Sequence, residues 1–290
     1  MRTLVFGGEG MLGQSVSQHW RRQGAPVLAL GRRQVDITDA AAVADWAKRF
    51  APSVIVNCAA FTRVDDCEEQ EEKATAINGL AVGHLAHVAQ KHDALLLHVS
   101  SDYVFSGVFA GDASQPIPED AETGPRSAYG RGKLEGERQA LAYARSMIVR
   151  TSWLFGPGGP NFAATMRRLM VEGKTPLRVV DDQVGRPTYT PFLARALYDL
   201  AHRFQRGELP AQVVHYGNRD AVSWHGFASE IARIVDPSVE VLPVPTSEFP
   251  RPAERPAYSV LDVSRFEAWC DRVVEPWQSG LVEYLGNISG

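Results

Sequence analysis

The first half of the chain alternates short apolar runs with longer amphipathic stretches, and this alternation limits the possible folds more than any other feature. The apolar runs read TLVF, PVLAL, SVIVN, ALLLHVS and MIVR. The stretches between them place apolar residues at helical spacing, as in MLGQSVSQHWRRQG and DAAAVADWAKRF. Strands that alternate with helices form right-handed βαβ units. The sequence therefore predicts an α/β fold with a doubly wound parallel sheet.

The regular alternation ends near Arg150. Helical patterns recur in NFAATMRRLMVEG, PFLARALYDLAHRF and WHGFASEIARIV, separated by short strand-like runs such as LRVV and VVHY. Residues 243–256 read PVPTSEFPRPAERP and show neither helical nor strand periodicity. We expect a Rossmann-type nucleotide-binding domain at residues 1–150. A smaller substrate-binding lobe is expected at 151–290, interleaved with strands and helices that return to the first domain.

Charge and hydropathy exclude several classes of function. The formal net charge is −4, whereas a nucleic-acid surface needs a clustered excess of Lys and Arg. No apolar stretch reaches the roughly 20 residues that span a bilayer, and MRTLVFGGEG runs into a glycine loop rather than a signal sequence. Cys58, Cys67 and Cys270 are too scattered for a zinc knuckle or a disulfide framework. We expect a cytoplasmic protein with reduced thiols and neither a nucleic-acid nor a membrane partner.

A glycine-rich loop follows the first predicted strand. The segment TLVFGGEGMLGQSV places Gly7, Gly10 and Gly13 between that strand and the first predicted helix. In this position, the backbone N–H groups at a helix N-terminus bind the pyrophosphate of a dinucleotide. Gly7 allows the tight turn, Gly10 the close approach of the cofactor, and Gly13 the close packing of helix on strand. A purely structural glycine turn is the alternative interpretation.

The end of the second predicted strand bears on the choice of cofactor. Many NAD-preferring proteins carry an acidic residue there that binds the ribose 2′-hydroxyl. Here the sequence reads LALGRRQVD, and Arg32 and Arg33 suit a 2′-phosphate unless both are merely solvated. NADPH is therefore favoured, with NADH as the alternative. Asp36 and Ile37 are expected at a turn near the adenine, and residues 57–61 end the third strand, where further cofactor contacts should fall.

A Tyr-x-x-x-Lys pair lies in the predicted helix SAYGRGKLEGER. Tyr129 and Lys133 are one helical turn apart, so their side chains share a face about 5–6 Å apart at Cβ. Ser101 ends the fourth strand, on the rim that also carries the glycine loop. An adjacent ammonium lowers the pKa of a phenol, so Tyr129 can protonate a carbonyl that Ser101 polarises, while Lys133 binds the nicotinamide ribose. Gly130 and Gly132 suggest close approach of the cofactor or a neighbouring strand.

With these motifs the chain resembles the short-chain dehydrogenase/reductase superfamily, in its extended branch that modifies sugar nucleotides. Within that branch it is similar to the dTDP-4-dehydrorhamnose reductase family, whose members reduce the 4-keto group of a dTDP-6-deoxy-L-sugar. The matching segments are VIVNCAAFTRVDDCE, SSDYVFSG, SAYGRGKLEGE, IVRTSWLFG, NFAATMRRL, DDQVGRPTYT and RPAYSVLDVSRF. Agreement in several separate segments is far more specific than any single motif.

The resemblance implies roles for individual residues. It implies cofactor contacts at Gly10, Met11, Leu12, Asp36, Ile37, Ala59, Ala60 and Phe61. It implies catalysis by Ser101, Tyr129 and Lys133. It implies sugar-nucleotide binding by Ser101, Asp102 and Trp153. Ser101 stands where the family usually has threonine, a change that keeps the hydroxyl.

Two comparisons with the family pattern limit the chemistry. Related dehydratases usually place an Asp-Glu pair after the hydroxyl residue, whereas here Tyr103 follows Asp102, so dehydration lacks its expected base. Some family members are described with Mg²⁺. The sequence offers no carboxylate cluster from which to name ligands, so Mg²⁺ enters by resemblance only and we predict no metal-binding residue.

Other candidate residues have a structural as well as a functional interpretation. Trp153 follows the fifth strand, where its ring can stack on a sugar or base or belong to the core. Arg186, Arg251 and Arg255 lie in loop-like segments, where a guanidinium can pair with a substrate pyrophosphate or remain solvated. The acidic run DDCEEQEE is expected to be a solvated helix start.

The predicted reaction converts dTDP-4-dehydrorhamnose to dTDP-L-rhamnose by hydride transfer from NADPH or NADH. A sugar-nucleotide epimerase that retains NAD is a second hypothesis, and it predicts a cofactor that copurifies with the protein. A non-catalytic regulatory subunit with the same fold is a third, although such a subunit needs none of the predicted catalytic residues. The sequence leaves open which nucleotide and which 4-keto sugar are used, and whether the protein is a monomer or a homodimer.

Overall fold

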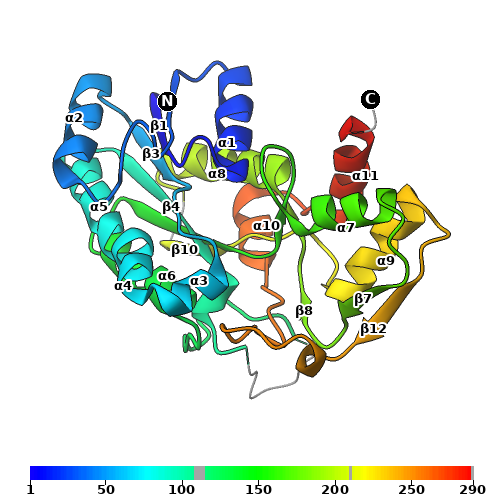
Figure 1. The fold of residues 1–290 in the computed structure, drawn as a ribbon. Helices are drawn as coiled ribbons and strands as arrows, with labels where there is room; N and C mark the ends of the chain where they lie inside the picture. The colour runs from blue at the N-terminus through cyan, green and yellow to red at the C-terminus, as the bar shows by residue number, and fades with distance from the viewer. Residues whose placement is uncertain (108–114, 209–210, 289–290) are drawn as a thin grey trace.

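A six-stranded sheet forms the centre of the computed structural model, which describes residues 1–107, 115–208 and 211–288 (Figure 1). All neighbouring strands are parallel. In order across the sheet they are β10 (Val213–His215), β5 (Ser146–Thr151), β4 (Leu95–Ser101), β3 (Val54–Asn57), β1 (Thr3–Phe6) and β2 (Val27–Leu30). The chain passes from β1 outward to β2 and returns to the other side of β1 for β3. The doubly wound parallel sheet is confirmed, with its switch point between β1 and β3.

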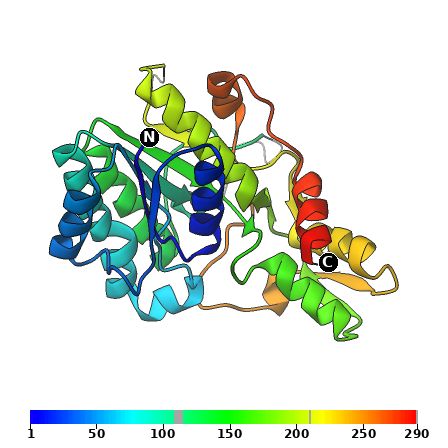
Figure 2. The same ribbon diagram turned by 90° about the horizontal axis from the view of Figure 1, so that it is seen from above.

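Helices cover both faces of this sheet (Figure 2). One face packs against α1 (Met11–Arg22), α8 (Thr190–Gln205) and α10 (Ser264–Cys270). The other packs against α2 (Ala40–Phe50), α5 (Ala81–Lys91) and α6 (Ala128–Leu141). Because side chains alternate along a strand, Val54 and Val56 of β3 enter the first cluster and Ile55 enters the second. Continuous apolar strands such as β3 are therefore buried on both faces.

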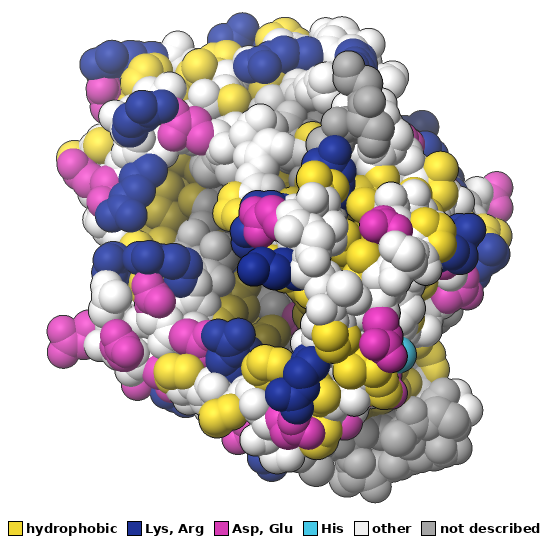
Figure 3. All heavy atoms as spheres, turned by 45° about the vertical axis from the view of Figure 1, so that its right-hand side comes forward, with side chains coloured by type: hydrophobic (Ala, Val, Ile, Leu, Met, Phe, Trp, Pro, Cys, Tyr) yellow, Lys and Arg dark blue, Asp and Glu magenta, His cyan; other side chains and the backbone are white. Residues whose placement is uncertain are grey.

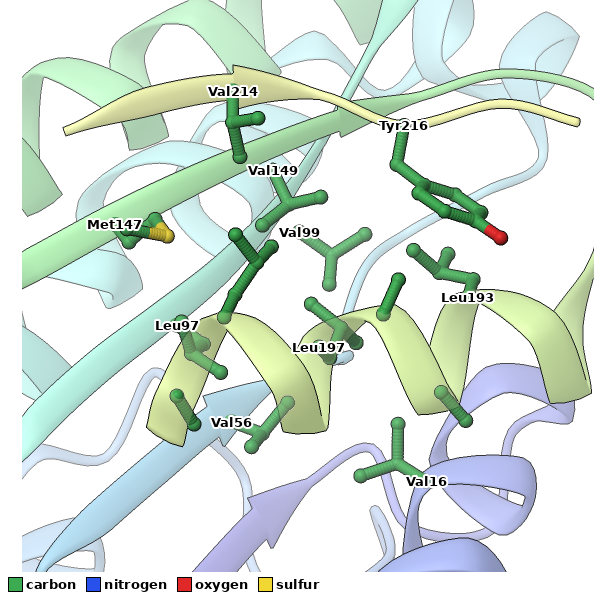
Figure 4. Packing of buried hydrophobic residues seen from close by; sticks show 14 of the residues in the cluster. Val16, Val56, Leu97, Val99, Met147, Val149, Leu193, Leu197, Val214 and Tyr216 are labelled. Carbon is green, nitrogen blue, oxygen red and sulfur yellow. The ribbon is translucent and has the colours of Figure 1, made fainter. Parts of the chain in front are cut away.

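Helix α8 joins the first of these clusters although it follows residue 150 in the sequence. Figure 4 shows Leu193 and Leu197 of α8 against Val99 and Val149 of the sheet, all of them buried. Strand β10, also from the second half, pairs with β5. The second half of the chain thus contributes strand β10 to the central sheet, and helices α8 and α10 to one of its faces.

The remaining second-half elements form a smaller lobe with its own buried cluster. Its helices are α7 (Phe162–Val171), α9 (Trp224–Val235) and α11 (Trp277–Ile288). Its strands pair as β6 (Leu154–Phe155) with β9 (Thr188–Tyr189), β7 (Leu177–Val180) with β12 (Val241–Val244), and β8 (Val184–Gly185) with β11 (Val222–Ser223). Buried aromatic residues, including Phe155, Tyr189 and Phe227, hold these elements together. Among the described residues no helix is both long and apolar enough to cross a membrane.

Two expectations for connecting segments are corrected. The proline-rich segment 243–256 does contain regular structure, because β12 pairs with the edge of β7 and a 3₁₀ turn, η3 (Thr246–Glu248), follows. Edge pairing tolerates the missing N–H of Pro243. The acidic run is not simply solvated, because Asp65 accepts hydrogen bonds of 2.6 and 2.9 Å from Arg255, and Glu71 accepts one of 2.8 Å from Arg131.

Short helices connect β3 with α5 and line the rim of the sheet. They are α3 (Val64–Glu69), α4 (Glu71–Ala74) and a π-helix, η1 (Thr75–Leu80), which runs directly into α5. A 3₁₀ turn, η2 (Asp102–Val104), follows β4. The π-helix packs closely on α6, so the segment after β3 and the helix with the Tyr/Lys pair are built against each other.

Candidate active site

A cleft of about 1550 Å³ opens at the carboxyl ends of the strands, between the sheet and the smaller lobe. Figure 3 shows the molecule hollowed at the centre of one face, with Lys and Arg side chains around the opening. Small-molecule sites usually enclose about 300–1,000 Å³. The cleft is therefore large enough to take two ligands side by side, and it lies where doubly wound sheets bind nucleotides.

The glycine loop lies at one end of this cleft, at the switch point of the sheet. Gly7 has a φ of 77°, and a Cβ there would lie 2.6 Å from the N of Ala59. A Cβ on Gly13 would lie 2.1 Å from the carbonyl O of Gly7, so Gly13 supports the loop from behind and does not line the cleft. Gly10 precedes α1, and among the described residues no side chain caps the first turn of this helix. The loop therefore fits a pyrophosphate bound by backbone N–H groups.

The other predicted cofactor residues converge on the same end of the cleft. Those that line it are Gly7, Gly10, Met11, Leu12, Arg32, Asp36, Ile37, Ala59, Ala60 and Phe61. Hydrogen bonds of 3.0 and 2.7 Å from the N and Oγ1 of Thr38 close a turn at Asp36 and lower the pKa of its carboxyl group.

Asn78, which the sequence analysis missed, holds the segment after β3. It lies in the π-helix, is buried, and bonds both the N (2.7 Å) and the O (3.0 Å) of Phe61. A lone amide in the apolar stretch AINGLAVG was the available signal, since a buried amide needs partners. Asn78 therefore sets the position of the Ala60 and Phe61 backbone at the cleft wall.

Glu9 was also missed, although it lies within the glycine loop. Its side chain packs on Gly31, where a Cβ would lie 2.1 Å from the Glu9 Cδ, and it accepts a 3.4 Å hydrogen bond from Arg33. A carboxylate therefore does lie at the end of β2, but it comes from the loop rather than from the strand. Arg32 lines the cleft, whereas the Arg33 side chain is 89% exposed and turned to Glu9.

Local structure places the Tyr/Lys pair at the cleft. Ser127 caps α6 by accepting a 3.1 Å hydrogen bond from the N of Gly130, and Glu68 accepts one of 2.8 Å from the N of Ala128. This double cap puts Tyr129 in the first turn of the helix and Lys133 one turn later, and both line the cleft. The acidic run of α3 thus has a definite role in the start of α6.

Ser101, Tyr129 and Lys133 come together at the wall of the cleft. The Ser101 hydroxyl donates a 2.8 Å hydrogen bond to Asp102 Oδ1 and is also hydrogen-bonded to the Tyr129 side chain. The ring of Tyr103 packs edge-on against that of Tyr129, with centroids 5.4 Å apart. These contacts place the Tyr129 hydroxyl beside the Ser101 hydroxyl, at a part of the cleft wall that a ligand can reach.

The expected lowering of the Tyr129 pKa by Lys133 is wrong for this arrangement. Burial raises the pKa of Tyr129, and the hydrogen bond between Tyr129 and Ser101 offsets this only in part. The ammonium of Lys133 instead donates a 2.6 Å hydrogen bond to the O of Val99. The one-turn spacing puts both residues on one face of α6 but gives no information on burial, which here controls the pKa of Tyr129. At neutral pH the phenol is protonated, which is the form that can donate a proton.

The glycines of α6 serve helix packing rather than approach of a cofactor or a strand. A Cβ on Gly130 would lie 2.2 Å from the O of Tyr103 in η2. A Cβ on Gly136 would lie 2.3 Å from the O of Asn78 in the π-helix, and one on Gly132 would lie 3.2 Å from the O of Ala74. Glycine therefore lets η2 and the π-helix pack directly on the helix that carries the Tyr/Lys pair.

Asp102 is a buried carboxylic acid at the cleft wall. Ser101 and Ser259 hydrogen-bond it, but the Oδ2 atom has no partner among the described residues. Burial raises the pKa of Asp102 from 3.8 to about 6. Its ionised form is thus costly in the fold until a ligand supplies a donor.

Replacing Asp102 with Asn should stabilise the protein in a pH-dependent way. Because the folded-state pKa lies above the unfolded one, the wild type loses stability as pH rises from about 4 to about 6. The variant lacks this loss and should gain about 2–3 kcal/mol above pH 6 and little below pH 4. Denaturant unfolding across this pH range measures the difference. Asp36→Asn, where the native pKa is lowered, is the control and should lose stability toward neutral pH. A pH-independent gain in Asp102→Asn would contradict the assignment.

The lobe side of the cleft carries an aromatic wall. Trp153 stacks on Trp224 with ring centroids 3.5 Å apart and planes at 6°, and Phe162 packs against Trp224 at 4.6 Å. Trp224 therefore covers one face of Trp153, and Trp153 itself also lines the cleft, so its contact with the sugar nucleotide stays a prediction. Trp224 and Phe162 each begin a helix, α9 and α7, and both line the cleft. They were missed because the helical pattern assigns them to packing.

The three predicted loop arginines lie in different surroundings in the structure. Arg251 lines the cleft. Arg255 also lines it, but its guanidinium is paired with Asp65. Arg186 lies outside the cleft lining and donates to the O of Asn218. Within the described ranges, no group of three or more His, Cys, Asp or Glu side chains could hold a metal ion.

Comparisons with known proteins agree along the whole chain. The family model described as RmlD substrate binding domain matches residues 1–289. A dTDP-4-dehydrorhamnose reductase from Streptomyces griseus is 43% identical over 293 residues, which is 100% of this chain and 94% of that protein.

Solved structures agree as well. The structure of a dTDP-4-dehydrorhamnose reductase from Clostridium acetobutylicum has a TM-score of 0.92 and 37% identity, covering 100% of both chains. That of a Bacillus anthracis dTDP-4-dehydrorhamnose reductase in complex with NADP has a TM-score of 0.92 and 31% identity, covering 99% of both chains. The family model, the full-length identity and the shared fold lead to one conclusion: this chain belongs to the dTDP-4-dehydrorhamnose reductase family.

Proposed function

We propose that this protein reduces the C4 ketone of a dTDP-4-keto-6-deoxy-L-sugar, converting dTDP-4-dehydrorhamnose to dTDP-L-rhamnose with NADPH or NADH. The observation that carries the proposal is the meeting of Ser101, Tyr129 and Lys133 at the wall of a cleft that also contains the glycine loop. Membership of the reductase family, shared along the whole chain, supports the same reaction.

The residues at the sheet end of the cleft would hold the cofactor. The glycine loop and the uncapped first turn of α1 suit the pyrophosphate. Asp36 and Ile37 suit the adenosine end, and Ala59, Ala60 and Phe61 line the path toward Tyr129. When bound, NADPH or NADH supplies the hydride that reduces C4.

Side chains of the protein would complete the reduction at the carbonyl oxygen. Tyr129 donates its phenolic proton to this oxygen, which becomes the C4 hydroxyl. Ser101, which is hydrogen-bonded to Tyr129, would turn its hydroxyl hydrogen from Asp102 to the carbonyl oxygen and hold that oxygen beside the phenol. The ammonium of Lys133 binds the nicotinamide ribose and stabilises the phenolate left on Tyr129 until solvent reprotonates it. The aromatic wall and Arg251 would contact the sugar nucleotide, with Asp102 accepting from a sugar hydroxyl.

The proposal is tested by following NADPH oxidation spectroscopically with purified protein and dTDP-4-dehydrorhamnose. We expect one NADPH oxidised per ketone reduced, and dTDP-L-rhamnose as the product by chromatography and NMR. The same assay with other dTDP-4-keto sugars ranks the substrates. Absence of turnover with every 4-keto sugar nucleotide tested would refute the reductase function. A change in sugar configuration without net NADPH oxidation would favour an epimerase.

Cofactor preference should depend on two side chains of opposite charge. Removing Arg32 at the cleft wall should raise the KM for NADPH about tenfold and leave that for NADH nearly unchanged, because a 2′-phosphate loses its guanidinium partner. Glu9→Gln should act in the opposite direction, since its carboxylate repels a 2′-phosphate and can accept from a 2′-hydroxyl. Arg33→Ala is the matched control, because that side chain is 89% exposed. Equal changes for both cofactors in Arg32→Ala would contradict this explanation.

A further inference from the structure

A buried ion pair lies directly behind the catalytic rim. Glu137 of α6 and Arg150 of β5 are 2% and 5% exposed. Hydrogen bonds of 2.9 Å (Nε to Oε1) and 2.8 Å (Nη2 to Oε2) join the guanidinium to the carboxylate. Ser100, the neighbour of Ser101 on β4, donates a 2.5 Å hydrogen bond to the same Oε1 atom. The Glu137 carboxylate is therefore fixed by β4 and β5 as well as by its own helix.

Glu137 follows Lys133 by one turn of α6, so the two side chains lie on one face of the helix. Among the described residues, the titratable groups of other elements that face Lys133 are Cys58 after β3 and His98 on β4. Burial raises the pKa of Cys58 to about 12 and holds that of His98 well below its usual value, so both are neutral at pH 7. Tyr129, one turn earlier on α6, is protonated. Among these groups, Glu137 alone offers Lys133 a negative charge.

We infer that Glu137 is a positioning residue, whose carboxylate, held by Arg150 and Ser100, keeps the buried Lys133 side chain charged at the rim of the cleft. This role rests on the proposed function, in which Lys133 acts through its ammonium. A buried ammonium without a counter-ion tends to lose its proton. Arg150 has a second effect, because it shares the carboxylate on which Lys133 depends.

The balance between these charges sets the pH range in which Lys133 can act. Burial lowers the pKa of Lys133 to about 8, and Glu137 opposes this fall. Removing the carboxylate should therefore lower the pKa of Lys133 further. Removing the Arg150 guanidinium should raise the pKa of Lys133, because Lys133 then no longer shares the Glu137 carboxylate with a second buried cation. If the ion pair served packing alone, the two removals would not shift the pKa of Lys133 in opposite directions.

The test is the pH profile of kcat for reduction of dTDP-4-dehydrorhamnose by NADPH. In the wild type the alkaline limb should fall near pH 8, where Lys133 loses its charge. We expect Glu137→Gln to move this limb down by about one pH unit and Arg150→Met to move it up by a similar amount. Limbs that stay in place, or that move in the same direction in both variants, would overturn the inference.

Two further variants guard against misfolding. Glu137→Gln combined with Arg150→Met removes the ion pair as a unit and avoids a lone buried charge, which is the main cost of the single changes. Its limb should lie between those of the single variants. Ser100→Ala removes a hydrogen bond but no charge, so its limb should stay where it is in the wild type. If the alkaline limb of Ser100→Ala were displaced as far as that of Glu137→Gln, the effect would come from packing, and the inference would be overturned.

Failure of the proposed function remains distinguishable from failure of this inference. If the wild type turns over no 4-keto sugar, the proposed function fails. The pH dependence of NADPH binding, measured by the fluorescence of the bound cofactor, then tests the inference without a substrate. The midpoint of the alkaline loss of binding should lie lower in Glu137→Gln than in the wild type. Equal midpoints would contradict the role of Glu137.

Discussion

Replacing Tyr129 with Phe should lower kcat about 10²–10⁴-fold, the usual contribution of a positioned general acid, while NADPH affinity stays close to that of the wild type. The substitution removes the proton donor but keeps the ring, which packs edge-on against Tyr103. Steady-state kinetics and fluorescence titration with NADPH measure the two quantities separately.

Tyr103→Phe is the matched control for this substitution. Tyr103 also lines the cleft, and its ring contacts that of Tyr129. Because only the Tyr129 hydroxyl is hydrogen-bonded to Ser101, loss of the Tyr103 hydroxyl should change kcat much less. Full activity in Tyr129→Phe, or an equal loss in both variants, would exclude Tyr129 as the proton donor.

Gly130→Ala should destabilise the protein by about 1–3 kcal/mol, the usual cost of overpacking a rigid contact. The new Cβ would lie 2.2 Å from the O of Tyr103, a backbone atom that cannot turn away. Only a movement of η2 can remove this clash. Because η2 directly follows Ser101, the movement should displace Ser101 and lower kcat as well. Denaturant unfolding and steady-state kinetics measure the two effects.

Gly286→Ala gives the control for this change in another helix. Gly286 lies in α11, and a Cβ there meets none of the described residues within 4 Å. Alanine in an open helical position should gain about 0.5–1 kcal/mol. If Gly130→Ala were as stable as Gly286→Ala, the close contact between α6 and η2 would not be needed for the fold.

The sheet and the position of the cleft could be predicted because their signals are local in the sequence. Apolar runs such as SVIVN are continuous because β3 is buried on both faces. The spacing of Gly7, Gly10 and Gly13 reflects contacts within one turn and the segment after β3. Parallel strands then bring Ser101 and the Tyr129 helix to the same rim without any further information.

The parts that could not be predicted depend on contacts between distant segments. Trp224 covers Trp153 across 71 positions of sequence, and Arg255 pairs with Asp65 across 190. No local pattern distinguishes these side chains from core or solvated ones. A helical fragment also says nothing about burial, which reversed the expected direction of the Tyr129 pKa. Similarly, the glycines of α6 allow close packing of the π-helix and η2 on this helix, and that packing can be seen only in the assembled fold.

The central claim is direct hydride transfer to the sugar ketone, and isotope transfer tests it most directly. The protein is incubated with dTDP-4-dehydrorhamnose and NADPH deuterated on one face of the nicotinamide C4, and a second reaction uses the other face. We expect deuterium at C4 of the sugar in dTDP-L-rhamnose from one of the two labelled cofactors, with an equal amount of NADP⁺ formed. A reduced sugar without deuterium from either cofactor, or recovery of both labelled cofactors unoxidised, would contradict it.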